Sequence, residues 1–367
     1  MKRILAMVLA LTLLFSFGGC SLFAGEGKAR VAVFWYEESD VYLTSVREHL
    51  EKKLGTYDIR FKHYFAAGNQ SKQIDQIKAA VADGVDMLVV NQVTAGSLDT
   101  AMDILTIAKD LPVVFFNRYI GTEMIPDVPF FEDHLNSCYI GTDAPKAGHL
   151  QGKLIGDYVL EHYNDIDLNR DGTISYALFK GDEADVSAIY RTLYSVEDAN
   201  TILQSAGKPE LSYFDQSAPE DQRYQVDLAG KWSSKAAAAY MEANLKTYNE
   251  ENRDMIELVI CNNDNMAEGV VSVLKEHGYN QPGGHTVPVF GVDATEEGKA
   301  LIAEGSMAGT VKQDAEGMAS AIAQTANAII DGKTPTEALA GLEDPRFSIA
   351  VDSASKLYVA YSPYSAK

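Results

Sequence analysis

Short runs of β-branched and aromatic residues alternate along the chain with segments in which apolar residues recur at helical spacing. The run RVAVFWY predicts a strand, and Leu43, Val46, Leu50 and Leu54 behind it predict one face of a helix. This alternation is typical of a parallel sheet that is covered by helices on both faces. The first lobe therefore has predicted strands at residues 30–36, 59–65, 86–91 and 112–117.

A second series of the same kind follows, which predicts a second doubly wound lobe. Its strands are expected at residues 139–143, 173–181, 211–217, 256–263, 287–293 and 308–314. Two such lobes that face each other form a cleft at the carboxyl ends of their strands. We therefore expect an α/β protein with two doubly wound parallel-sheet lobes and a three-segment hinge, near Gly141, Asp314 and Tyr358. The predicted lobes are 30–140 plus 314–356, and 141–313 plus 357–367.

The N-terminus predicts export. Two basic residues precede an uncharged apolar run over 4–17, which is shorter than the about 20 residues that span a bilayer. Gly18, Gly19 and Cys20 then fit the site at which lipoprotein signals are cut and the new N-terminal cysteine is acylated. We expect a signal peptide over 1–19, a tether over 20–29 and an extracytoplasmic protein anchored to the membrane through Cys20. The alternative is an ordinary cleaved signal peptide.

Composition narrows the possible partners. The formal net charge is −21, from 52 acidic and 31 basic residues, so the field of the molecule repels a phosphate backbone. Nucleic acid is therefore not an expected partner. Cys138 and Cys261 lie in apolar runs and are expected to be buried thiols.

Polar side chains stand where several predicted strands end. Planar amides and carboxylates at this edge of a sheet can offer paired hydrogen-bonding atoms to the neighbouring hydroxyls of a sugar. Each of them can also cap a helix or close an Asx turn, which is the commoner role for a single position. The residues are Asp40, Asn117, Asn263, Asp293 and Gln313.

The run DLNRDGTIS at 167–175 has the spacing of a calcium loop. Oxygen side chains occupy loop positions 1, 3, 5 and 9, and Gly172 at position 6 allows the sharp turn. Leu178 stands where a bidentate glutamate would complete the set, so a carboxylate from elsewhere is needed. The expected ligands of a structural Ca²⁺ are Asp167, Asn169, Asp171, Thr173 through its carbonyl, and Ser175.

Several of these segments together resemble a known family. They are the run NQSKQIDQIKAAVADGVDMLVVN, the motif YIGTD, the calcium loop, the run LVICNNDNMAEG and the motif VPVFGVDA. In combination they resemble the galactose/glucose-binding proteins of sugar ABC importers, which are type I periplasmic binding proteins. The resemblance implies a monomer that captures a monosaccharide, performs no catalysis and delivers the sugar to a membrane permease and its ATPase.

The resemblance also implies roles for individual residues. Tyr42 and Trp232 match the aromatic pair that sandwiches the sugar ring, although each could instead be a packing residue. Glu257 matches the distant calcium ligand, and Asn262 is expected to be structural because it points away from Asn263. Asp40, Asn117, Arg191, Asn263 and Asp293 match the residues that bind the sugar hydroxyls.

Three positions depart from the family pattern. Asp185 and Ser187 replace a histidine and an aspartate, and Gln313 replaces an asparagine. Because these positions face the sugar hydroxyls in the family, we expect a glucose- or galactose-like ligand whose ranking among sugars differs.

Two other functions are compatible with parts of this pattern. A sensory receptor of the same fold would present a sugar or small signal to a membrane kinase or chemoreceptor. A glycosidase would use two carboxylates in the cleft, but no apolar surroundings that would raise the pKa of one of them are evident from the sequence.

Overall fold

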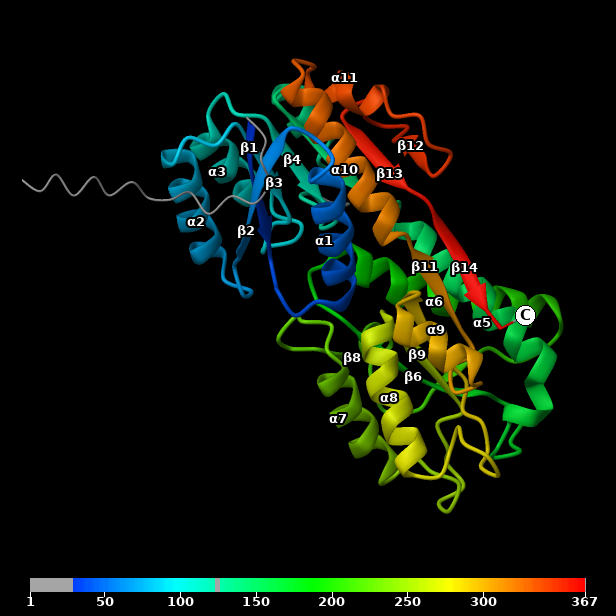
Figure 1. The fold of residues 1–367 in the computed structure, drawn as a ribbon. Helices are drawn as coiled ribbons and strands as arrows, with labels where there is room; N and C mark the ends of the chain where they lie inside the picture. Colours follow the sequence, from blue (N-terminus) through cyan, green and yellow to red (C-terminus); the bar gives the residue numbers. More distant parts are fainter. Residues whose placement is uncertain (1–28, 123–125, 367) are drawn as a thin grey trace, which may run out of the picture.

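Two mostly parallel seven-stranded sheets, one in each lobe, form the framework of the computed structural model (Figure 1). The structure describes residues 29–122 and 126–366. The predicted signal peptide and Cys20 lie outside this range. Within it, no helix is both long enough and apolar enough to cross a membrane.

The first sheet has the strand order β12-β13-β5-β4-β3-β1-β2, and only β12 runs antiparallel to its neighbour. Its short central strands are fully buried, as expected for strands that are covered on both faces. The strands are β1 (Ala29–Trp35), β2 (Ile59–Phe65), β3 (Met87–Val90), β4 (Val113–Phe116), β5 (Ser137–Gly141), β12 (Phe347–Ile349) and β13 (Lys356–Val359).

Helices cover both faces of this sheet. Leu50 of α1 and Met318 of α10 belong to the core on one face, and Ile77 of α2 and Ile104 of α3 to the core on the other. The predicted helical stripe of α1 is correct, because Leu43, Val46, Leu50 and Leu54 are all buried. The helices are α1 (Val41–Leu54), α2 (Gln70–Ala82), α3 (Leu98–Ala108), α4 (Val128–Asp133), α10 (Ala315–Ile330) and α11 (Pro335–Ala340).

The second sheet has the order β14-β11-β10-β9-β6-β7, with β8 paired to β6, and only β14 is antiparallel. Its strands are β6 (Ser175–Lys180), β7 (Ser212–Tyr213), β8 (Gln225–Val226), β9 (Leu258–Cys261), β10 (Val289–Asp293), β11 (Gly309–Gln313) and β14 (Tyr361–Ser365). Its helices are α5 (Ala144–Ile166), α6 (Val186–Ser205), α7 (Ser234–Leu245), α8 (Asp264–Glu276) and α9 (Glu296–Ala303), with a 3₁₀ turn at Glu220–Gln222.

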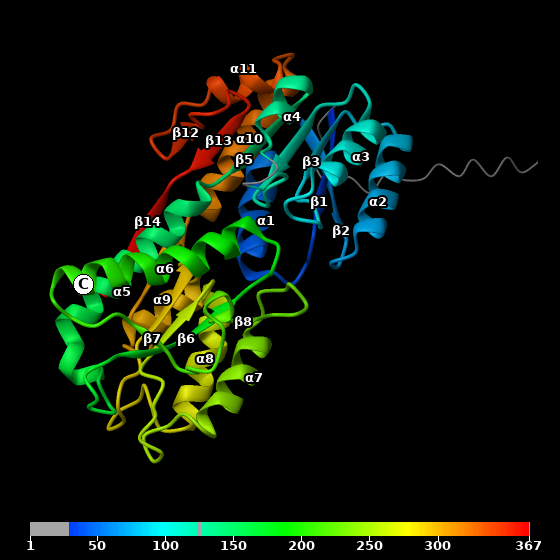
Figure 2. The same cartoon turned by 180° about the vertical axis from the view of Figure 1, so that it is seen from behind.

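Helices α5 and α6 pack closely along one side of the second lobe (Figure 2). Gly148, Gly152 and Gly156 form a row at i, i+4 spacing on the contact face of α5. A Cβ on Gly152 would collide with the backbone carbonyl of Tyr194. The glycine row therefore sets how closely the two helices approach.

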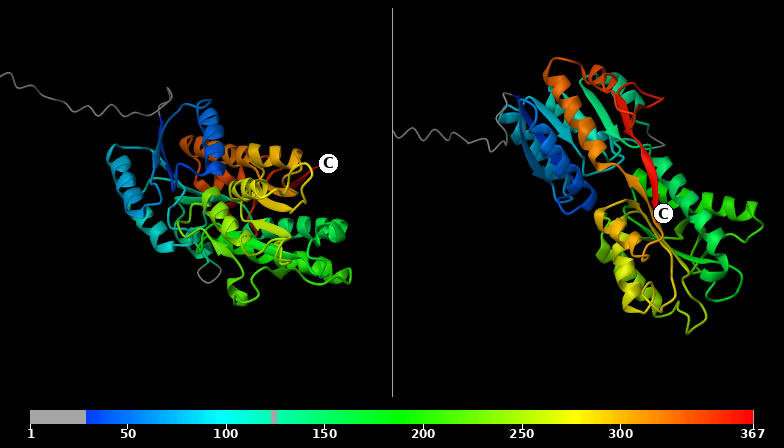
Figure 3. Two further views of the ribbon diagram at one scale, coloured as in Figure 1. Left: turned by 90° about the horizontal axis from the view of Figure 1, so that it is seen from below. Right: turned by 45° about the vertical axis from the view of Figure 1, so that its right-hand side comes forward.

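Three segments connect the lobes, and the right-hand view of Figure 3 shows the last of them beside the C-terminus. They run from β5 to α5, from β11 to α10 and from β13 to β14. The predicted fold, two parallel-sheet lobes with a three-segment hinge, is confirmed.

Some boundaries differ from the prediction. The strand expected at 139–143 pairs with β4 and so closes the first lobe rather than opening the second. The last lobe boundary falls at Ala360 and not after residue 356, because β13 stays in the first sheet as far as Val359. The strand expected over 211–217 shrinks to β7, since Asp215 turns the chain by accepting hydrogen bonds from the amide and hydroxyl of Ser217.

Replacing Gly152 with alanine should lower the free energy of unfolding by about 1 to 3 kcal/mol, because the added methyl group forces α5 and α6 apart. Urea denaturation followed by circular dichroism measures the change. Lys153→Ala is the control, since the Lys153 side chain is exposed on the same helix and should change stability by less than about 0.5 kcal/mol. Equal stability of the two variants would show that the helices do not depend on this contact.

Candidate functional site

A cavity lies between the lobes, at the carboxyl ends of strands from both sheets, and the centre of a water-sized sphere can move through about 40 Å³ of it. All ten residues that the sequence predicts as sugar-binding line this one cavity, together with Tyr36 and Arg118, which the sequence analysis missed. The ten are Asp40, Tyr42, Asn117, Asp185, Ser187, Arg191, Trp232, Asn263, Asp293 and Gln313.

Three of the lining side chains also cap helices. Asp40 accepts a hydrogen bond from the Leu43 amide at 2.8 Å, and Asn263 accepts one from the Met266 amide at 2.9 Å. Asp185 caps α6 in the same way. The helix-cap interpretation is therefore correct for Asp40 and Asn263, yet both residues still line the cavity. A cap fixes one end of the side chain and so orients its remaining lone pairs.

Three residues of the cavity wall have a strained backbone. Asn117, Trp232 and Asp293 have φ angles of 62°, 54° and 121°, in the region that favours glycine. The Tyr139 hydroxyl donates a hydrogen bond of 2.7 Å to the Asn117 carbonyl and so stabilises the backbone conformation of Asn117. Residues held this way at a strand end are a recurrent feature of binding sites.

Arg191, in the cavity wall, forms hydrogen bonds with several segments of the second lobe. Its guanidinium donates hydrogen bonds to the Asn262 carbonyl at 2.8 Å and to Gln313 Oε1 at 2.7 Å. It also lies 5.5 Å from the centre of the Trp232 ring. The Asn262 side chain accepts a hydrogen bond from the Gly181 amide at 3.1 Å and is not part of the cavity wall, as the sequence predicts.

The two aromatic residues come from different lobes. Tyr42 belongs to α1 and also packs in the first core, whereas Trp232 precedes α7. Gly181 leaves room for the indole, since a Cβ there would collide with the Trp232 ring. Both rings are more than nine-tenths buried in this form of the protein.

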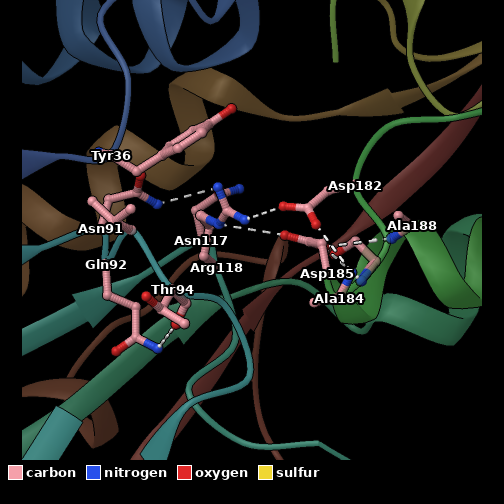
Figure 4. Close-up of polar contacts among 12 residues, drawn as sticks. Tyr36, Asn91, Gln92, Thr94, Asn117, Arg118, Asp182, Ala184, Asp185 and Ala188 are labelled. Carbon is pink, nitrogen blue, oxygen red and sulfur yellow. Dashed lines mark hydrogen bonds and ion pairs between the residues drawn. The ribbon is translucent and has the colours of Figure 1, made fainter. Parts of the chain in front are cut away.

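Arg118 joins the lobes at the cavity wall (Figure 4). It follows β4 in the first lobe and forms ion pairs with Asp182 at 2.7 Å and Asp185 at 3.4 Å, both in the second lobe. Its guanidinium also lies 4.2 Å from the centre of the Tyr36 ring. The sequence did contain one signal for this contact: Arg118 directly follows the strand-end residue Asn117, in a chain rich in acidic residues.

A third ion pair crosses between the lobes. Lys231, next to Trp232, lies 2.9 Å from Glu37, which follows β1. Glu37 is buried, whereas the lysine side chain is about half exposed. Three ion pairs, two from Arg118 and one from Lys231, therefore cross between the lobes beside the cavity.

The acidic groups of the cavity are incompletely satisfied. Burial raises the pKa of Asp293 well above its usual value, and Arg191 offsets this only in part. The Asp293 carboxylate forms no hydrogen bond or ion pair with any residue that the structure describes. Burial also raises the pKa of Asp40, although the Leu43 amide and the Tyr36 hydroxyl donate to it. A ligand that donates hydrogen bonds would satisfy both carboxylates.

The predicted calcium loop is brought together with Glu257. The Glu257 carboxylate accepts hydrogen bonds from the amides of Asn169 at 2.8 Å and Ser175 at 3.0 Å, one at each end of the loop. Burial, together with the charges of Asp167 and Asp171, raises the pKa of Glu257 to about 7. None of these three carboxylates forms an ion pair with a basic residue of the described chain, so only backbone amides offset their charge.

The other loop side chains are engaged with the protein. Asp167 accepts from the amides of Asp171 and Gly172, each at 3.1 Å, and Asn169 accepts from the Met255 amide at 2.7 Å. Asp171 accepts from the Thr173 amide, and the Ser175 hydroxyl donates to the Met255 carbonyl. As the described side chains stand, no three of the His, Cys, Asp and Glu groups converge on one point suited to an ion.

Two lobes that share a polar cavity across three connections define a ligand-binding protein of the hinged, two-lobed class. A family model for the periplasmic binding protein domain matches residues 31–334, and the chain belongs to this family. It is therefore a solute-binding protein and not an enzyme, which excludes the glycosidase hypothesis. Membership also implies an extracytoplasmic location.

Individual relatives agree with this assignment. The chain is 29% identical over 318 residues to the D-galactose/methyl-galactoside binding periplasmic protein of Haemophilus influenzae, covering 86% of this chain and 85% of that protein. A putative rhizopine-binding protein of Rhizobium meliloti is 25% identical over 294 residues, or 79% of each chain.

The fold matches that of solved structures. An ABC transporter solute-binding protein from Clostridium phytofermentans, solved with bound β-D-glucose, superposes with a TM-score of 0.68. The two sequences are 18% identical, and the match covers 92% of this chain and 94% of the other.

The variant Arg118→Gln should populate a more open form in the absence of ligand, because it removes ion pairs that cross between the lobes. Loss of a buried pair costs about 3 kcal/mol, which shifts a balance between two forms by about a hundredfold. Small-angle X-ray scattering should show a larger radius of gyration than for the wild type.

Lys146→Gln is the matched control, since it removes the same charge from an exposed position on α5. Its radius of gyration should stay at the wild-type value. If Arg118→Gln is as compact as this control, the ion pairs do not hold the lobes together.

Proposed function

We propose that this protein captures a monosaccharide in the cavity between its lobes and delivers it to the permease of an ABC importer. The observation that carries the proposal is the composition of the cavity wall, in which two aromatic rings from different lobes stand among carboxylate, amide and guanidinium groups. The C–H face of a pyranose is apolar and its rim carries hydroxyls, so this combination suits a sugar. The D-galactose/methyl-galactoside binding protein of Haemophilus influenzae and the solute-binding protein solved with bound β-D-glucose support the same ligand class.

Closure would couple binding to delivery. A sugar that contacts Asp40 and Asn117 of one lobe and Asn263 and Asp293 of the other favours the form in which both sets are close. A permease can then distinguish the loaded, closed protein from an open one. Sugar binding would add to the cross-lobe ion pairs of Arg118 and Lys231 rather than replace them.

We propose a neutral hexose of the glucose or galactose type as the ligand. Two of the three positions that depart from the family pattern are engaged within the protein: Asp185 pairs with Arg118, and Gln313 accepts from Arg191. Their hydrogen-bonding capacity towards a sugar is reduced by these contacts. The ranking of sugars should therefore follow the wall formed by Asp40, Asn117, Asn263 and Asp293.

We propose that Cys20, in the segment outside the described residues, carries a lipid that anchors the protein at the membrane surface. The sequence Gly18-Gly19-Cys20 behind the apolar run supports this proposal. The anchor would keep the protein close to the permease.

We also propose that the loop at 167–175 binds a structural Ca²⁺. The charge of Asp167, Asp171 and Glu257, which only backbone amides offset, supports a cation there, and each carboxylate oxygen keeps a lone pair beyond its backbone hydrogen bond. Ion binding requires these groups to turn further towards one another. The bound ion would neutralise their charge and link the loop to the segment that leads into β9.

Isothermal titration calorimetry with glucose, galactose, xylose and ribose should show the tightest binding for one of the two hexoses. Asp293→Ala and Trp232→Ala should each weaken that binding up to about a hundredfold, since a hydroxyl or a ring face then loses its partner. Ser217→Ala, at an exposed turn of the second lobe, serves as the unaffected control. Binding of none of the four sugars, or unchanged affinity in both cavity variants, would refute the proposed ligand class.

Calcium should raise the melting temperature, and a chelator should lower it, because an ion that binds only the folded chain stabilises that chain. Differential scanning calorimetry with and without the chelator measures the effect. The variants Asp171→Ala and Glu257→Gln should lose the response to calcium. The loop is not a calcium site if wild-type melting is the same in both conditions.

A further inference from the structure

Asn91 lies behind the cavity wall of the first lobe, directly after β3 (Figure 4). It is fully buried and does not line the cavity, so it does not touch a ligand held there. Its backbone amide donates a hydrogen bond to the Phe34 carbonyl at 2.9 Å, and its carbonyl accepts one from Gln73 Nε2 at 2.9 Å. Buried polar networks in which every member is satisfied are rigid, so Asn91 is a fixed point behind the wall.

The Asn91 side chain has one orientation that satisfies its neighbours. Its Oδ1 accepts a hydrogen bond from the Tyr36 amide at 3.3 Å, and its Nδ2 donates to the Phe116 carbonyl at 3.1 Å. Because a backbone amide only donates and a backbone carbonyl only accepts, these contacts identify the oxygen end and the nitrogen end of the side chain. The other hydrogen of Nδ2 is then donated to Asn117 Oδ1, which lies 3.4 Å away.

This contact decides how the Asn117 side chain is turned. With its Oδ1 towards Asn91, its NH2 group is the end that remains for the cavity, and that group donates to no residue that the structure describes. The reversed side chain would place two NH2 groups 3.4 Å apart with no acceptor between them. The Asn117 backbone is held as well, since its amide donates to the Ile140 carbonyl at 2.9 Å and its carbonyl accepts from Tyr139.

We propose that Asn91 is a positioning residue of the binding site, which keeps the Asn117 NH2 group turned towards the ligand as a hydrogen-bond donor. This inference rests on the proposed function. A sugar hydroxyl has one hydrogen to donate and two lone pairs to fill, so carboxylates alone would leave its lone pairs without a donor. Asp40 and Asp293 accept hydrogens from the hydroxyls, and Asn117, held by Asn91, supplies a hydrogen in return.

A double-mutant cycle tests this role. Isothermal titration calorimetry is carried out with D-glucose or D-galactose, whichever the wild type binds more tightly. The variant Asn91→Ala should weaken binding about tenfold, because Asn117 is then free to turn its NH2 group away from the sugar. In the Asn117→Ala background the same change should weaken binding by less than about twofold, since Asn91 acts through Asn117.

Asn280→Ala is the matched control. Asn280 is also buried, its Nδ2 donates to the carbonyls of Val287 and Ser306 at 2.7 and 3.0 Å, and its Oδ1 accepts from the Val287 amide at 2.7 Å. It precedes β10, whose opposite end meets the cavity, so this variant should lower the melting temperature and keep wild-type affinity. If Asn91→Ala behaves like this control, or if the losses add in the double variant, the inference is wrong while the proposed function stands.

The side-chain amide of Asn117 gives a second measurement that needs no change at Asn91. Its signals in a two-dimensional nitrogen–proton NMR spectrum are those that disappear in Asn117→Ala. The proton signals should move downfield when the sugar is added to the wild type, because the NH2 group then donates to a hydroxyl. Unmoved signals at saturating sugar would overturn the inference even if Asn91→Ala does not fold. If neither hexose binds the wild type, the proposed function fails and this inference fails with it.

Discussion

Arg118 is the contact on which the closed arrangement most depends. A buried guanidinium is tolerated only with partners, and its ion pairs are both with carboxylates of the second lobe, while the first lobe supplies the aromatic face of Tyr36. Asp182 and Asp185 of the second lobe supply the charge. The two lobes are therefore complementary in charge beside the cavity, and this pairing brings both of its walls together.

The other side chains of the cavity wall are positioned by the loops that follow the carboxyl ends of the parallel strands. Helix caps at Asp40, Asp185 and Asn263 fix side chains that also face the cavity, so the same hydrogen bonds that begin the helices orient the binding groups. Left-handed backbone at Asn117 and Asp293 turns two further strand ends into the cleft. The resulting wall is polar, partly unsatisfied and framed by one aromatic residue from each lobe, which is why a sugar suits it better than an apolar or a strongly anionic ligand.

The two-lobed fold and most residues of the cavity wall could be predicted from the sequence, because strand periodicity and polar residues at strand ends are local signals. Asp40, Asn117 and Asp293 were found in this way, and the family resemblance added Tyr42, Arg191 and Trp232. Arg118 was missed because its importance comes from Asp182 and Asp185, which no local pattern connects with it. The placement of β5 in the first sheet also depends on pairing rather than on composition.

The most direct test of the central claim is a crystal structure of the protein grown with D-glucose or D-galactose. The sugar ring should lie between Tyr42 and Trp232, with its hydroxyls bonded to Asp40, Asn117, Asn263 and Asp293, and with Arg118 still paired to Asp182. A sugar bound outside this cavity, or an empty cavity in crystals saturated with both hexoses, would contradict the proposed site.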